Sequence, residues 1–520
     1  MGNGILKGHF SRPICGLALL LIAGQAFAQS ADVGPGLLDE RLVYANDVER
    51  SAAAANQATF DSLDTACNPN GQLDGIAAPT GFVRPDNCSE LQFFVYLTTR
   101  ELVHSANALL GEGPTIASLG VTQQGLGTAL RWTAAEELAV QGSMATQFSN
   151  NQLANLASRL TALRSGARGF TVAGLNSTPE SWGRGVLAGL GLNESPGQSD
   201  GNGYSRWGGF FNGTAGSGDR EATGNENAFD FDNQEFTIGL DYRVRPDLVI
   251  GGMVGYSSQT VDFDPNASRV SVVSGNMESE GNSALLFALI NGENLYVSAS
   301  VGSQQIDYEL QRDIRYPSFN AALPDSNSRA TSTPEATTVT GTFDIGYAWT
   351  RGAVTVEPYL GIDYVDVTID AFEEARSFSL LSGLIDNDGF NLVVAEQTFQ
   401  SLDTTVGLRF QYTLTPTWGV VSPYVTFEYH RELQDAPRTI QARYAGAGNE
   451  AFAFSVATDP FDSDFYLWSV GVSSVIRGGR ERRYDGPVSG GVSVYAQYQS
   501  VAQLEFFSEQ TLSLGIRYEF

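Results

Sequence analysis

The sequence predicts a mainly β fold, a twelve-stranded antiparallel transmembrane β-barrel preceded by a helical N-terminal region. Three observations support this prediction. The last eleven residues alternate strictly between apolar and polar side chains, up to the aromatic Phe520. Twelve strand-like runs follow Tyr204. Short links between these runs alternate with long polar links, as in barrels that have short turns at one end and long loops at the other.

The final run, residues 510–520, illustrates the alternation. One face carries Leu512, Leu514, Ile516, Tyr518 and Phe520, and the other carries Thr511, Ser513, Gly515, Arg517 and Glu519. A period of two is the mark of a strand with one apolar and one polar face. We expect this run to pair with the first run, residues 206–215, because closure removes both exposed edges. Arg517 then faces the lumen, while Tyr518 and Phe520 face lipid.

The remaining runs define the links. The runs cover 206–215, 234–244, 247–259, 282–290, 294–308, 337–349, 353–369, 399–414, 419–432, 463–476, 488–499 and 510–520. The short links are 245–247, 291–293, 350–352 and 415–418, and the long ones are 216–233, 260–281, 309–336, 370–398, 433–462 and 477–487. The intermediate link 500–509 is assigned to the short class. A soluble β-sandwich is the alternative, but it has no reason to alternate loop lengths so regularly.

Composition narrows the functional classes. The 520 residues carry a formal net charge of -28 and 57 glycines. Such an acidic excess argues against a nucleic-acid partner, which needs a basic face, and suits acidic extracellular loops. We expect no cofactor and no metal.

The N-terminus is typical of a secretory signal over residues 1–28. Lys7 and Arg12 precede an apolar stretch that ends before the sequence Ala26-Phe27-Ala28, and cleavage there would leave Gln29 first. Cys67 and Cys88 are the two cysteines that follow. In an exported chain they most simply form one disulfide, which closes a loop rich in Pro, Gly and Asn.

Between the signal and the barrel, the spacing predicts helices over 37–60, 89–110 and 128–164. Ser89 is a candidate N-cap. The third segment lacks helix breakers apart from Gly142, and Leu153, Leu156, Leu160 and Leu163 recur on one face of it, with Arg159 and Arg164 beside them.

The runs RWGGFFNGTAGSGDR and FDFDNQEFTIGLDYRVRPDLVIGGMVGYSSQ, the twelve-run layout and the C-terminal IRYEF together resemble the β-domain of autotransporters (type V secretion). The resemblance covers residues 151–520. It implies a monomeric barrel in the cell outer membrane, in contact with lipid and lipopolysaccharide, whose lumen is threaded by a helix that leads to an N-terminal passenger. It also implies that periplasmic chaperones and the barrel-assembly machinery handle the chain, with Tyr518 and Phe520 as the assembly signal.

The predicted domains are therefore a signal peptide (1–28), a short, mainly helical passenger (29–143), a pore helix with connector (144–204) and the barrel (205–520). A twelve-stranded barrel has room for one helix, and Arg159 and Arg164 could pair with lumen acids. The lumen face is expected to present Asp241, Arg243, Asp344, Glu357, Asp363, Asp403, Arg409, Glu428 and Arg517. The alternative is an ordinary amphipathic helix within the passenger. About forty residues separate Arg164 from Arg206, whereas the family's helix usually leads almost directly into the first strand.

Catalysis is not expected. Residues 29–203 contain neither G-D-S-G nor G-x-S-x-G, and their single histidine, His104, lies in a helical run. Asn150-Asn151, at the expected head of the pore helix, is a candidate for self-cleavage by asparagine cyclisation, although Asn is also common where helices start. The sequence thus predicts a non-enzymatic β-domain that inserts in the outer membrane and anchors or translocates its own short passenger. The alternative is a porin-like channel with an N-terminal plug.

Overall fold

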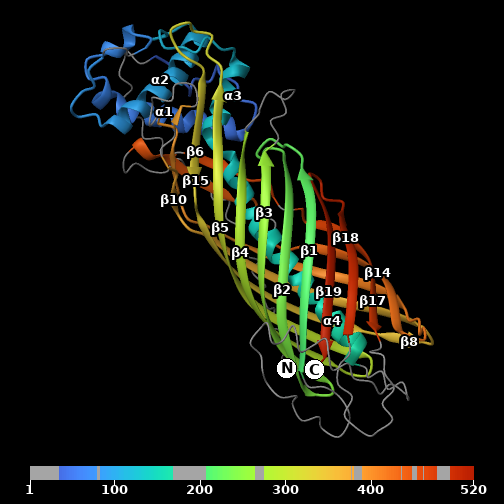
Figure 1. The fold of residues 1–520 in the computed structure, drawn as a ribbon. Helices are drawn as coiled ribbons and strands as arrows, with labels where there is room; N and C mark the ends of the chain where they lie inside the picture. The colour runs from blue at the N-terminus through green and yellow to red at the C-terminus, as the bar shows by residue number, and fades with distance from the viewer. Residues whose placement is uncertain are drawn as a thin grey trace, which may run out of the picture.

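In a computed structural model, the chain forms a closed β-barrel, a helix inside it and a group of helices over one end (Figure 1). The structure describes residues 34–78, 82–167, 207–263, 274–375, 378–379, 389–434, 436–447, 454–460, 462–476 and 492–519. The expected signal segment, including Ala26, Ala28 and Gln29, lies outside these ranges, as does Phe520. Among the described helices, none is both long and apolar enough to cross a membrane.

Twelve of the described strands close the barrel, and all neighbours are antiparallel, which confirms the predicted fold class. The first and last strands pair along their whole length, from Gly208 opposite Glu519 to Arg220 opposite Phe507. The barrel strands are β1 (Trp207–Arg220), β2 (Phe229–Arg245), β3 (Leu248–Phe263), β4 (Ser274–Asn291), β5 (Leu295–Tyr316), β7 (Glu335–Tyr347), β9 (Val354–Ile369), β13 (Gln397–Tyr412), β14 (Gly419–Glu432), β17 (Asp464–Ile476), β18 (Val492–Ala502) and β19 (Phe507–Glu519). A short strand, β8 (Trp349–Arg351), pairs with β9.

The two faces of the barrel wall follow the predicted alternation. On β2, Phe236, Ile238 and Leu240 are exposed, whereas Thr237 and Asp241 are buried. An apolar outer surface is the face that lipid covers. Near the loops the outer face turns polar, as on β5, where Ser303, Gln305, Asp307 and Glu309 follow the exposed Val301. The lipid-facing part of β5 therefore ends near Val301.

Counting the strands along the chain corrects the end of the barrel that was assigned to two of the predicted links. We call the end with links 246–247 and 292–294 the turn end, and the opposite end the loop end. Ile476 and Val492 are register partners at the turn end, so link 477–487, expected among the long loops, leaves from the turn end. Ala502 and Phe507 lie at the loop end, so the short link between them belongs there. Each strand runs from one end of the barrel to the other. The end at which a link lies therefore depends on how many strands precede it, and not on the length of the link.

Several strands continue beyond the barrel at the loop end (Figure 1). The long end of β5 pairs with β6 (Ser326–Ser332), and β6 pairs with β11 (Phe378–Ser379). A separate four-stranded sheet has the order β10 (Phe372–Glu373), β12 (Leu392–Val394), β15 (Thr439–Tyr444) and β16 (Phe454–Ala457), and the turn η3 (Ala445–Ala447) follows β15. All these strands lie in stretches expected to be loops. We call the four-stranded sheet, which contains β10, β12, β15 and β16, the loop sheet.

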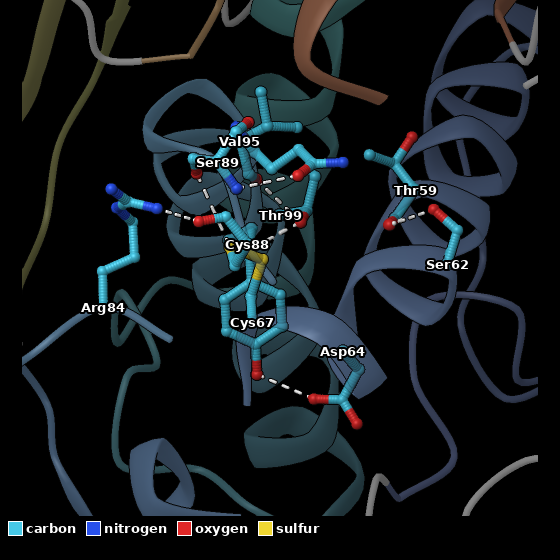
Figure 2. The surroundings of a disulfide bond; sticks show 11 residues. Thr59, Ser62, Asp64, Cys67, Arg84, Cys88, Ser89, Val95 and Thr99 are labelled. Atoms are coloured by element: carbon cyan, nitrogen blue, oxygen red, sulfur yellow. Dashed lines mark hydrogen bonds between the residues drawn. A yellow bond between two sulfur atoms is a disulfide. The ribbon is translucent and has the colours of Figure 1, made fainter. Parts of the chain in front are cut away.

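The helices over the loop end form what we call the cap, residues 34–78 and 82–138. It comprises α1 (Asp47–Cys67), η1 (Gln72–Gly75), α2 (Glu90–Leu110), α3 (Gln123–Ala134) and η2 (Glu136–Leu138). Ser89 caps α2 in a capping box with Gln92. A disulfide joins Cys67 at the end of α1 to Cys88 just before α2 (Figure 2). The Tyr96 hydroxyl of α2 donates to Asp64 of α1 at 2.8 Å. The disulfide closes the η1 loop against the helix pair.

The predicted helix 128–164 is broken in two. Ala135 has a positive φ of 58°, so α3 ends there, and α4 (Ala139–Ala167) begins after η2 in a new direction. Alanine is the best helix former, and nothing local in the sequence signals the break. Tertiary contacts flank it, since Arg312 of β5 donates to the Trp132 carbonyl at 3.4 Å and Asn56 of α1 donates to the Thr133 hydroxyl at 3.1 Å. Across the bend, Glu136 is buried against Arg131 at 2.8 Å.

Candidate functional site

The lumen is occupied by α4, which enters at the loop end and reaches the turn end (Figure 1). Its start lies beside the loop residue Arg438, which donates to the Ala139 carbonyl at 3.2 Å, and near its end Arg164 pairs with Glu357 of β9. A threaded helix was part of the predicted fold, and it is confirmed. The helix begins at Ala139, before the expected boundary at residue 144.

One face of α4 packs on one side of the wall. Its four leucines, predicted from their helical spacing, form a buried cluster with side chains of β1, β3, β4 and β5. The cluster contains Leu153, Leu156, Leu160, Leu163, Phe210, Val249, Met253, Leu285, Phe287, Leu289 and Tyr296. Glycines of the wall give room for these side chains. A Cβ at Gly251 would lie 2.3 Å from the Phe287 ring.

Buried ion pairs fasten the half of α4 that lies nearer the turn end. Arg159 pairs with Asp241 of β2 and lies over the Phe210 ring, 4.5 Å from its centroid. Arg517 of β19 also approaches Asp241, at 3.8 Å, so one carboxylate serves two guanidinium groups. Arg164 donates a hydrogen bond to Glu357 at 2.8 Å, and its guanidinium lies 3.8 Å from the centre of the Tyr296 ring. The polar lumen face thus acts as a set of anchors for the helix.

Side-chain amides and hydroxyls fasten the half of α4 that lies nearer the loop end. Gln152 and Asn155 both donate to the buried carboxylate of Glu235, at 3.2 and 3.3 Å. Thr214 of β1 donates to Asn155 at 2.7 Å, and Ser149 donates to Gln304 of β5 at 3.2 Å. Buried polar groups are costly unless they are hydrogen-bonded, so these bonds specify the register of α4 against the wall.

The opposite side of α4 borders a cavity of about 700 Å³. The helix presents short side chains here, among them Asn150, Ala154 and Ala157, and the wall presents acids from β7, β9, β13 and β14. His430 lies among these acids, with its Nδ1 2.5 Å from Asp403 and its Nε2 3.8 Å from Glu428. Across the described ranges, no group of three or more His, Cys, Asp or Glu side chains is arranged to hold a metal ion.

The structure brings most of the expected lumen residues to α4 or the cavity. Asp241, Glu357 and Arg517 take part in the anchors described above. Asp344, Glu357, Asp363, Asp403, Arg409 and Glu428 line the cavity. Arg409 lies over the Tyr424 ring, 3.9 Å from its centroid. Arg243 is half-buried on the same face of β2 as Asp241.

Sequence reasoning missed Glu235 and His430. Both could have been found by extending the period-two pattern, since Glu235 precedes Thr237 and His430 follows Glu428 on the same faces. The Arg312–Glu374 pair, described below, has no such signal, because the two residues come from different long loops.

The Asn150-Asn151 pair lies inside α4, eleven residues after its start at Ala139, and not at the head of the helix as expected. The helix continues N-terminally because the stretch before the pair, apart from Gly142, has no breaker. Both residues line the cavity, Asn150 as an exposed residue and Asn151 as a buried one. His104 is also buried. Its Nδ1 accepts from the Ala117 N–H at 3.2 Å, and burial lowers the pKa of its ring to about 3, so it serves as a neutral packing residue.

The cap and the loop end meet in a buried interface that we call the seam. Arg312, on the extension of β5, donates to both oxygens of Glu374 at 2.9 and 2.7 Å and to the Phe390 carbonyl at 2.9 Å, and it reaches the Trp132 carbonyl of the cap at 3.4 Å. Burial raises the pKa of Glu136 to about 7, although Arg131 opposes the shift. Apolar residues of cap, loop sheet and upper barrel form one continuous core.

Comparison with protein families identifies a match to the autotransporter β-domain over residues 209–479. Among solved structures, the translocator domain of the autotransporter NalP from Neisseria meningitidis matches with a TM-score of 0.43 and 12% identity, over 65% of this chain and 93% of that chain. The β domain of the Bordetella autotransporter BrkA matches with a TM-score of 0.38 and 12% identity, over 61% and 100%. The transport unit of AIDA-I from Escherichia coli matches with a TM-score of 0.37 and 14% identity, over 64% and 97%. No curated protein matches the sequence.

Proposed function

Because the chain belongs to the autotransporter β-domain family, we propose that its barrel holds the cap at the cell surface as a permanently attached, uncleaved passenger. The barrel is an outer-membrane β-domain, which inserts in the membrane and anchors or translocates its own N-terminal segment. We assign the cap to the passenger, α4 to the pore helix and residues from Trp207 onward to the anchor. The signal segment 1–28 and cleavage before Gln29 remain part of this proposal.

The observation that carries the proposal is the shared core of the seam. Hydrophobic side chains of the cap and of the loop end belong to one cluster. Tyr444 of the loop sheet donates to Asn56 of α1 at 2.9 Å, and the Ser455 N–H donates to Ser51 at 2.8 Å. A passenger built for release would not need a core in common with its anchor. Separation would expose the apolar surface and break the hydrogen bonds together.

The side of the membrane follows from the loops. Outer-membrane barrels have short turns on the periplasmic side and longer loops outside. The cap covers the loop end, and α4 passes from there to the turn end, where β1 begins. This arrangement supports a surface position for the cap.

We infer no catalytic role for the cap. The cap has a buried core and the Cys67–Cys88 disulfide, and both features are typical of a stable surface module. The partners we propose are outer-membrane lipid and lipopolysaccharide around the apolar outer face, with periplasmic chaperones and the barrel-assembly machinery during biogenesis. The barrel acts as a monomer.

The alternative function, a porin-like channel with an N-terminal plug, is supported by one feature, the cavity beside α4. Conductance of the purified protein in planar bilayers separates the two functions. A large, steady conductance with the cap and α4 in place would favour the channel.

The proposal is tested by protease shaving of intact cells combined with mass measurement of the protein extracted from outer membranes. We expect one species that contains both cap and barrel, with the cap accessible to antibodies on intact cells. A barrel fragment that begins at Asn151 would show self-cleavage and overturn the proposal, and an Asn150→Ala variant would then identify the reacting residue. A cap detectable only after the outer membrane is opened would overturn its surface position.

A further inference from the structure

The seam contains a carboxylate whose oxygens accept no hydrogen bond from any described side chain. Glu137, in η2, is 1% exposed, and neither of its carboxylate oxygens has a hydrogen-bond partner among the described residues other than its own backbone N–H. Its neighbour Glu136 is equally buried but accepts two bonds from Arg131, both at 2.8 Å. The two adjacent acids therefore have opposite environments, although the sequence gives them identical chemistry.

The positive charge that acts most strongly on Glu137, Arg312, is already committed to another acid. Arg312 binds Glu374 through two nitrogens, at 2.9 and 2.7 Å, and its other bonds go to the carbonyls of Phe390 and Trp132. Glu374 also accepts from the Leu392 N–H at 2.8 Å. If Glu137 were ionised, the buried group of Glu137, Arg312 and Glu374 would carry a net negative charge. Burying an uncompensated charge is far more costly than burying a neutral carboxylic acid.

These contacts join the cap to the barrel. Glu137 lies on the cap side, directly before α4, whereas Arg312 belongs to β5 and Glu374 follows β10. Other titratable groups around the trio are Glu136 of η2, which accepts from Arg131, and Tyr444 of β15, whose hydroxyl donates to Asn56. A second positive charge that could neutralise Glu137 is not among these groups.

We propose that Glu137 is a proton-dependent latch of the seam, neutral while the cap is docked and ionised when the seam opens, so that the cap loosens as the external medium becomes alkaline. This inference rests on the proposed function, because it requires an attached cap at the loop end.

The direction follows from proton linkage. Burial raises the pKa of Glu137 in the docked state from 4.5 to about 8, with Arg312 opposing the shift. In water an opened seam restores the lower pKa, so opening releases a proton between pH 4.5 and 8, and rising pH favours opening in this window. One released proton changes the opening equilibrium by about tenfold per pH unit. Glu136, with its pKa raised to about 7, adds a similar contribution below pH 7.

The test compares full-length wild-type protein with Glu137→Gln in detergent micelles between pH 5 and 8. Hydrogen exchange of the amides of residues 136–138 and 389–394, corrected for the intrinsic rate at each pH, reports the opening equilibrium. We expect the logarithm of the opening constant to rise with pH in the wild type, and to rise by about one unit less per pH unit in Glu137→Gln. Glu112→Gln, at an exposed cap position, serves as the matched control and should follow the wild type. Equal slopes in wild type and Glu137→Gln would overturn the inference.

A second measurement needs no stable glutamine variant. The infrared spectrum of the wild-type protein should contain the carbonyl band of a protonated carboxylic acid at pH 6 that disappears above pH 8 and shifts in Glu137→Asp. A spectrum in which no such band responds to Glu137→Asp would overturn the inference. If the cap is docked and attached but shows no Glu137-dependent slope, only the latch fails. If the cap is cut from the barrel or lies inside the cell envelope, the proposed function fails first.

Discussion

Asp241 offers the most direct test of how the lumen holds its helix. Its carboxylate pairs with Arg159 of α4 and lies 3.8 Å from Arg517 of β19. The change Asp241→Asn keeps the shape of the side chain but leaves two buried guanidinium groups without their shared counter-charge. Removing one partner of a buried ion pair costs about 3–5 kcal/mol. We therefore expect α4 to open locally about two to four orders of magnitude more often.

The reciprocal change should cost less. In Arg159→Met, Asp241 still has Arg517 at 3.8 Å, and the long apolar side chain can remain beside Phe210. The loss is then mainly that of a charged hydrogen bond, about 1.5–3 kcal/mol, or one to two orders of magnitude in the opening constant. The asymmetry between the two variants comes from the shared carboxylate, and a simple isolated pair would not produce it.

Hydrogen exchange of the α4 amides around Leu156 to Leu163, measured on the full-length protein in micelles, gives the opening constant. Asp232→Asn serves as the matched control, because it makes the same substitution on the outward face of the same strand. The reasoning is refuted if Asp241→Asn changes exchange less than tenfold, or if Arg159→Met is as damaging as Asp241→Asn.

Three further predictions concern the cap and assembly. Replacing Cys67 and Cys88 together by serine should destabilise the cap by about 3 kcal/mol, because the open chain regains loop entropy. Thermal unfolding of the cap measures the loss, and a reductant should weaken the wild type but leave the variant unchanged. Ala135→Gly should change the stability of the cap by less than about 1 kcal/mol, because glycine adopts the positive φ of 58° without steric cost but removes a fully buried methyl group; a loss of more than about 2 kcal/mol would contradict the argument. Deleting Phe520, or changing it to Asp, should lower outer-membrane levels far more than Glu112→Gln does, and normal levels of the variant on immunoblots would refute its role as assembly signal.

Much of the barrel could be predicted because its signals are local. A strand that faces lipid on one side and a lumen on the other must alternate residue by residue. That requirement identified the runs, their faces and most lumen residues, including Asp241 and Glu357. The helical spacing of the leucines identified α4 in the same way. The two misassigned links near the C-terminus came from judging sides by length, whereas the side depends on how many strands have already crossed.

The seam could not be predicted, since its partners are far apart in the chain. Arg312 and Glu374 are 62 residues apart, and nothing near either residue marks it for an ion pair. The bend at Ala135 contradicts the helix propensity of alanine. Residues far away in the chain bind directly before it, Arg312 at the Trp132 carbonyl and Asn56 at the Thr133 hydroxyl. The strands of the loop sheet are two to six residues long, too short to carry a clear period.

The sequence by itself determined that this chain forms a twelve-stranded barrel with a helix suited to its lumen, because period and spacing are properties of neighbouring residues. Only the tertiary structure decided that the leucine face of α4 packs on β1, β3, β4 and β5 and that an acidic cavity lies on the other side of the helix. It also decided that the cap shares a core with the loops, and that Glu136 has an arginine partner while Glu137 has none. These outcomes depend on which distant side chains meet in low-dielectric surroundings, where one arginine can satisfy only some of the acids near it.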